Sequence, residues 1–258
     1  MEILLLRVAL APCLVLLVSV AARRLGPHRG GLLIGAPTST GPFLLLMCST
    51  YGPRTAARAV HGCVTGTLVV ACFGLAYARF ARTLRPAWTL PLALAGAATA
   101  GLVGALLGSV LLTAGLTAAV ILVGLVTCPP GDPGHRPPSR SRAWEIPLRM
   151  AMATALVLTA VTAARTLGSF VGGMLSALPI LLAIMGTALH RSAGAPVATD
   201  LMRGALSATT GTLCFLLALG ATLVPLGPAP AFLLALAALA ATQPLTRLPL
   251  LRPVTQAP

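Results

Sequence analysis

A run of about forty residues, from Trp88 to Cys128, contains no charged side chain. As a helix rising 1.5 Å per residue, this run would be about twice as long as the ~30 Å hydrocarbon core of a bilayer. We therefore expect two membrane-crossing helices that turn near Gly108 and Ser109. Lipid admits only helices and closed barrels, and a continuous apolar run lacks the alternating pattern of barrel strands.

The composition supports the same fold class. The chain is 57% hydrophobic and 9% charged, whereas soluble domains carry about 25% charged residues. Its net charge of +14 comes from arginine, because the sequence has no lysine. Basic residues of membrane proteins gather in cytoplasmic loops, so we expect the lipid bilayer as the partner of this chain and no nucleic acid. The sequence predicts an all-α integral membrane protein.

The chain also contains an internal repeat. Pro179 corresponds to Pro37, and Gly194 corresponds to Gly52. Both pairs are separated by the same repeat offset of 142 residues, since 179 − 37 and 194 − 52 both equal 142. From residue 6 to residue 76, about a third of the positions are identical to their counterparts without an insertion. Aligned glycine, proline, arginine and cysteine are not explained by apolar low complexity. We expect a first repeat over residues 1–128, a cytoplasmic linker rich in proline and arginine over 129–142, and a second repeat over 143–258.

Nine transmembrane helices are predicted, five in the first repeat and four plus a short tail in the second. The segment near residues 3–22 is interpreted as the first helix and not as a cleaved signal, because it recurs at the same offset. One helix in each repeat is interrupted by proline and glycine. The expected helices are about 3–22, 25–51 (broken), 56–78, two within 88–128, 146–164, 171–189 (broken), 201–223 and 230–245.

Arginine placement favours this topology. With nine crossings, fourteen arginines fall on one side and three on the other, leaving out Arg7; re-entrant broken segments would give ten against seven. The positive-inside rule then predicts the N-terminus outside and the C-terminus in the cytoplasm of a bacterial inner membrane. Five helices separate the starts of the repeats, so the second copy is expected to be inverted.

The broken segments are the candidate substrate site. Proline frees backbone carbonyls, and such groups are tolerated at membrane depth only when they line a cavity or are buried in protein. Helix ends there would favour an anionic group. The alternative is a kinked helix whose hydroxyls bond back to the preceding turn. The predicted substrate-binding residues are Pro37, Thr38, Ser39, Thr40, Gly41, Ser176 and Pro179.

Four polar residues lie near the starts of equivalent helices. Arg58 and His61 correspond to Asp200 and Arg203 at the repeat offset. They are predicted to form a gate or a substrate contact, or else to anchor their helices at the membrane interface.

Several chemistries are not supported. The four acidic residues (Glu2, Asp132, Glu145 and Asp200) all lie outside the deep parts of the expected spans, which argues against a carboxylate proton relay. The six cysteines show no metal-binding or disulfide spacing. Nucleotide-binding loops and nucleophile elbows are missing. We expect no catalytic residue, metal or cofactor, and hence no enzyme.

The segment G-G-x-L-x-x-x-P, which ends at Pro37 and again at Pro179, resembles small bacterial membrane families that include the GlpM-like proteins. The layout in two repeats is similar to that of drug/metabolite transporters with five-helix repeats, except that a tenth helix is missing. Neither resemblance carries over a substrate or a catalytic residue. The broken helices and the two inverted repeats predict a transporter or exporter of a small organic or lipid-like molecule, with alternating access at the repeat interface. The alternative is a non-transporting scaffold or accessory subunit of a membrane enzyme complex; a homodimer is left open.

Overall fold

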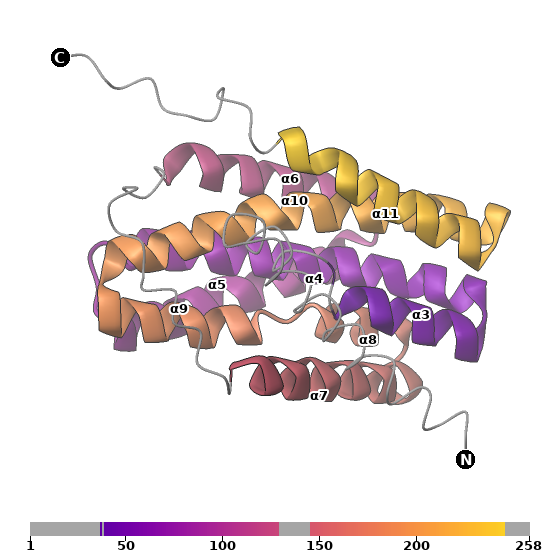
Figure 1. Cartoon of the computed structure of the whole chain (residues 1–258), viewed down its shortest axis with the longest axis horizontal. Coiled ribbons are helices and arrows are strands. Elements are labelled where there is room, and N and C mark those ends of the chain that lie inside the picture. The colour runs from indigo at the N-terminus through magenta and orange to yellow at the C-terminus, as the bar shows by residue number, and fades with distance from the viewer. Residues whose placement is uncertain (1–36, 38, 129–144, 246–258) are drawn as a thin grey trace.

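The computed structural model describes Pro37 and residues 39–128 and 145–245 (Figure 1). All regular elements in this part of the chain are helices: α3 (Thr40–Tyr51), α4 (Pro53–Phe80), α5 (Pro86–Leu107), α6 (Val110–Thr127), α7 (Glu145–Thr166), α8 (Ser169–Ser176), α9 (Ile180–Ala193), α10 (Ala195–Leu226) and α11 (Pro228–Leu245). The helix near residues 3–22, the first part of the first broken segment, the linker 129–142 and the tail beyond residue 245 lie outside the described residues.

The chain is an all-α membrane protein. Five stretches of the described residues are long and apolar enough to cross a bilayer: Pro53–Phe80, Pro86–Leu107, Val110–Thr127, Ser169–Ala193 and Ala195–Leu226. Two further apolar helices are shorter, Thr154–Thr166 within α7 and Pro228–Thr242 within α11. The total of nine crossings stays a prediction, because part of the chain that would supply them is not described.

The long apolar run divides where it was expected to. Gly108 ends α5 with φ of 63°, a left-handed conformation that glycine adopts without a steric penalty. Ser109 then starts α6, since its hydroxyl accepts a hydrogen bond from the Leu112 amide at 3.4 Å. The prediction of two helices turning at these two residues is confirmed.

The second broken segment is also interrupted at its proline. Helix α8 ends at Ser176 and α9 begins at Ile180, so Ala177, Leu178 and Pro179 form the break. Proline has no amide hydrogen, and its ring clashes with the carbonyl of the residue four positions earlier. These three residues are therefore not helical, whereas the residues before and after them are.

An antiparallel pair, α4 and α10, forms the centre of the molecule (Figure 1). A Cβ atom added to Gly220 would lie 3.1 Å from Val60 Cγ1, and one added to Gly74 would lie 3.5 Å from Leu206 Cγ. The order of these contacts is opposite along the two helices, which makes them antiparallel. Helices α3 and α5 pack on α4, and α9 and α11 pack on α10.

Several helices begin at matching distances along the chain. Gly52 precedes α4 with φ 84° and ψ 166°, and Gly194 precedes α10 with φ 89° and ψ 176°. These glycines are separated by the repeat offset, as are Pro86 and Pro228 at the starts of α5 and α11, since 194 − 52 equals 228 − 86. The left-handed φ at both glycines explains why glycine occupies both positions.

Glycines also allow α4 and α8 to approach closely. A Cβ atom on Gly62 would lie 1.9 Å from the Phe170 carbonyl oxygen, and one on Gly173 would lie 2.3 Å from the Ala59 carbonyl oxygen. Both distances are far inside van der Waals contact. Small residues at such positions let helix backbones pack together in membranes.

We predict that Gly173→Leu strongly reduces the yield of folded protein, because a leucine side chain must push α8 away from α4. The matched control is Gly115→Leu in α6, where an added Cβ atom meets nothing within 4 Å. The measurement is the monodisperse fraction in size-exclusion chromatography after detergent extraction. Equal yields for both variants would contradict the close packing of these two helices.

Candidate functional site

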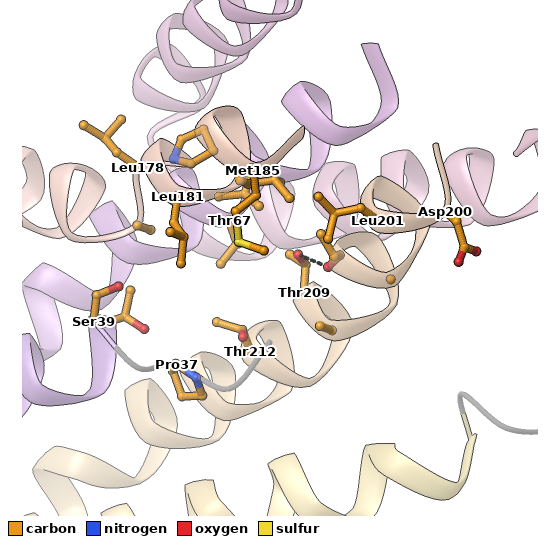
Figure 2. A pocket seen from close by; sticks show the side chains of 18 residues that line it. Pro37, Ser39, Thr67, Leu178, Leu181, Met185, Asp200, Leu201, Thr209 and Thr212 are labelled. Atoms are coloured by element: carbon orange, nitrogen blue, oxygen red, sulfur yellow. Dashed lines mark hydrogen bonds between the residues drawn. The ribbon is translucent and has the colours of Figure 1, made fainter. Parts of the chain in front are cut away.

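A cavity of about 390 Å³ lies where the two broken segments meet the central helix pair (Figure 2). Its wall comes from the start of α3, from the break between α8 and α9, and from α4 and α10. The lining residues are Pro37, Ser39, Thr40, Thr67, Val70, Ala177, Leu178, Pro179, Leu181, Leu182, Met185, Asp200, Leu201, Gly204, Ala205, Ala208, Thr209 and Thr212. Its size is typical of a small-molecule site, since such pockets span about 300–1,000 Å³.

The structure brings together four of the predicted substrate-binding residues. Pro37, Ser39 and Thr40 line the cavity from the first broken segment, and Pro179 lines it from the second. Thr38 lies outside the described residues. The two segments are thus neighbours in space although they are far apart along the chain.

Two of the predicted residues are not among those that line the cavity. Gly41 lies one position further along α3, where an added Cβ atom would meet nothing within 4 Å. Ser176 is buried at the end of α8, and its hydroxyl donates to the Gly173 carbonyl at 2.7 Å. Its Oγ atom also lies 3.6 Å from Cys63 Sγ. Ser176 therefore joins α8 to α4 beside the cavity.

Thr40 has an unusual environment for a polar side chain. It lines the cavity, is 3% exposed, and its hydroxyl oxygen has no hydrogen-bond partner among the described residues. Leaving a buried hydroxyl unpaired costs about 1–3 kcal/mol. A ligand that accepts or donates a hydrogen bond here would remove that cost.

Three threonines complete the polar part of the wall, and none of them was predicted from the sequence. Thr67 on α4 donates to the Val64 carbonyl at 2.7 Å, and Thr209 on α10 donates to the Ala205 carbonyl at 2.8 Å. Thr212 follows one turn after Thr209 and is also buried. Thr67 and Thr209 are equivalent at the repeat offset. The recurrence of threonine in the middle of both helices is the sequence feature that could have identified them as site residues.

The four candidate gate residues are not grouped at the cavity. Asp200 alone lines it, at the end remote from Pro37 and Ser39 in Figure 2. Arg203 donates to the carbonyl oxygens of Leu125 and Cys128 and so caps the C-terminus of α6. Arg58 is exposed at the start of α4.

His61 packs against α8 and does not line the cavity. Its ring makes an edge-to-face contact with Phe170, with centroids 5.1 Å apart. Its Nε2 atom is buried without a hydrogen-bond partner in the described part of the chain. His61 and Arg203 are equivalent at the repeat offset, yet they make different contacts.

The arrangement is suited to binding. The lining residues in the described ranges offer hydroxyls, aliphatic side chains, one thioether and one carboxylate. No group of three or more His, Cys, Asp or Glu residues that could hold a metal ion occurs within these ranges. A ligand in the cavity would contact hydroxyls from the start of α3, from α4 and from α10, together with apolar side chains.

Comparison of the chain with protein-family models, curated proteins and solved structures finds no match. The two family resemblances therefore stay predictions, and the assignment of a function depends on the geometry of the cavity.

We predict that cysteines replacing Thr67 or Thr209 react with a small water-soluble thiol reagent, because both positions face the cavity. The background is a cysteine-free variant of the full chain. Thr65→Cys is the matched control: it lies two residues before Thr67 on the same helix, is 0% exposed and is packed against Gly104. Equal protection of all three cysteines, measured by mass spectrometry, would contradict an accessible cavity.

Proposed function

We propose that this protein is a bacterial inner-membrane transporter or exporter of a small organic or lipid-like molecule. The cavity is the substrate site in this proposal, and two inverted repeats give alternating access to it. The observation that carries the proposal is that equivalent residues of both repeats line one cavity. At the repeat offset the pairs are Pro37 and Pro179, Ser39 and Leu181, Thr40 and Leu182, Thr67 and Thr209, and Val70 and Thr212.

The packing of the central helices supports the inversion. Helices α4 and α10 cover equivalent parts of the two repeats and run antiparallel, as an inverted second copy requires. The neighbours also correspond, since α3 and α5 pack on α4 whereas α9 and α11 pack on α10. Rocking one half against the other would open the cavity alternately to the two sides of the membrane.

The arginine distribution supports an orientation. When nine helices cross, fourteen arginines against three favour a cytoplasmic position for the linker 129–142. The N-terminus is then outside and the C-terminus inside the cell.

A scaffold in a membrane enzyme complex is the second candidate. The observation in its favour is that Asp200 is the single carboxylate among the described lining residues and lies at one edge of the cavity (Figure 2). Ion-coupled transporters commonly hold acids inside the membrane, so a cavity with a single carboxylate at its edge argues against ion-coupled transport and in favour of a scaffold. The transporter proposal is compatible with this lining when a substrate gradient alone drives uptake, since that requires no acid.

The topology is tested by labelling single cysteines in spheroplasts with a membrane-impermeant reagent. We predict that a cysteine at Gly52 is labelled from outside and that one within 129–142 is labelled only after lysis. Single cysteines in the other expected loops serve to calibrate exposure. Labelling of both sites from the same face would contradict nine crossings and the inverted repeat together.

The transport role is tested with the double variant Ser39→Ala/Thr40→Val, which removes two hydroxyls with little change in volume. Interhelical hydrogen bonds in membranes average only ~0.6 kcal/mol, so the variant should fold. We predict at least a tenfold loss of uptake into proteoliposomes, measured with radiolabelled hexanoate, leucine and ethidium as representative anionic, zwitterionic and cationic substrates.

Thr113→Val in α6 is the matched control, because Thr113 is buried, bonds to the Ser109 carbonyl at 2.9 Å and does not line the cavity. Unaltered uptake by the double variant would remove the first broken segment from the site. Absence of uptake of every probe by the unmodified protein would favour the scaffold.

A further inference from the structure

The cavity receives hydrogen-bond donors from the start of α9. The first intrahelical bond there runs from the Ala183 amide to the Pro179 carbonyl at 2.8 Å. The amides of Leu181 and Leu182 precede this bond and therefore have no acceptor within the helix. No side chain caps this helix, and proline has no polar side-chain atom to offer. Both leucines belong to the cavity wall.

The start of α3 faces the same cavity. Ser39 occupies its cap position without making a side-chain capping bond, and Thr40 is its first residue. Both residues line the cavity, and the Thr40 hydroxyl is the buried group without a partner among the described residues. This hydroxyl is an observation independent of the two helix termini. The Thr40 hydroxyl and the amides of Leu181 and Leu182 are thus hydrogen-bond donors that belong to residues lining one cavity.

The electrostatics match a single negative charge. A helix N-terminus carries a partial charge of about +0.5, and here α9 supplies it. The start of α3 adds little, because the Gly41 amide already bonds to the Pro37 carbonyl at 2.9 Å and Pro42 has no amide hydrogen. No arginine or histidine occurs among the described lining residues. The carboxylate of Asp200 lies at the far end of the cavity from Ser39 in Figure 2. A monoanion is therefore better matched than a doubly charged phosphate.

Most of the remaining wall is apolar, although Thr67, Thr209 and Thr212 also belong to it. Leu178, Met185 and Leu201 face the cavity across from Ser39 and Pro37 (Figure 2). The repeats also differ in polarity, because Ser39 and Thr40 of the first copy are replaced by Leu181 and Leu182 in the second. A ligand with a polar end at Thr40 and the start of α9, and an apolar end at Leu178, Met185 and Leu201, would match this lining.

We infer that the cavity binds a small monoanionic amphiphile of the carboxylate class, with its carboxylate at the N-terminus of α9 and beside the Thr40 hydroxyl. Its apolar chain packs against Leu178, Met185 and Leu201. This assignment deepens the proposed function and depends on its choice of the cavity as the substrate site. The volume of about 390 Å³ suits a short-chain molecule.

The test is saturable binding of tritiated hexanoate to the full chain in nanodiscs, corrected with empty nanodiscs for partition into lipid. The unlabelled competitors share the same chain and differ at the head: hexanoate, hexan-1-ol, hexylamine and hexyl phosphate. We expect hexanoate to compete at least tenfold better than the other three.

Thr40→Val should weaken hexanoate binding at least fivefold while leaving competition by hexan-1-ol unchanged, since an alcohol gains little from an extra donor. Thr113→Val serves as the control for a buried threonine outside the cavity and should bind as the unmodified protein does. Folding of both variants is verified by thermal denaturation in the same nanodiscs.

Several results would overturn the inference. Equal competition by the alcohol would mean that only the apolar wall binds, and preference for hexylamine would point to Asp200. A dominant hexyl phosphate, an unchanged affinity in Thr40→Val or no saturable binding would each contradict it as well. Hexanoate binding without hexanoate uptake would support the inference and contradict the transporter. Uptake of leucine or ethidium, without a preference for carboxylates in binding, would support the transporter and contradict the inference.

Discussion

The need of each backbone amide and carbonyl for a hydrogen-bond partner governs this structure. Lipid offers none, so a helix can be interrupted at membrane depth only beside a cavity or within packed protein. The break at Pro179 meets this condition, because it forms part of the cavity wall together with Pro37 and Ser39. The interruption at Pro179 therefore leaves the first amides of α9 beside the cavity.

Segments that correspond in the two predicted repeats share backbone features and differ in their side chains. Gly52 and Gly194 both have a positive φ, of 84° and 89°, and Thr67 and Thr209 each bond to a preceding carbonyl of their own helix. Thr40, in contrast, is replaced by Leu182 in the second copy. The reverse holds for Val70, which is replaced by Thr212, so segments of both copies contribute hydroxyls to the cavity.

The sequence predicted those features that depend on local chemistry. Helix ends at Gly108 and Pro179 follow from backbone conformation, and the two prolines of the broken segments identified part of the cavity. The remaining features depend on how helices rotate and pack. Thr212 faces the cavity and Arg203 caps α6 because of the tertiary arrangement, which residue spacing along one helix does not specify.

The antiparallel contact of α4 with α10 is tested most directly by disulfide formation in a cysteine-free background. Val60 Cβ lies 3.8 Å from a Cβ atom built on Gly220, within the ~3.5–4.5 Å of disulfides. We predict that Val60→Cys/Gly220→Cys forms a crosslink. Val60→Cys/Met202→Cys should not, because Met202 precedes Gly220 by about five helical turns, or ~27 Å along the helix. The opposite pattern would contradict the antiparallel pair and the inverted repeat.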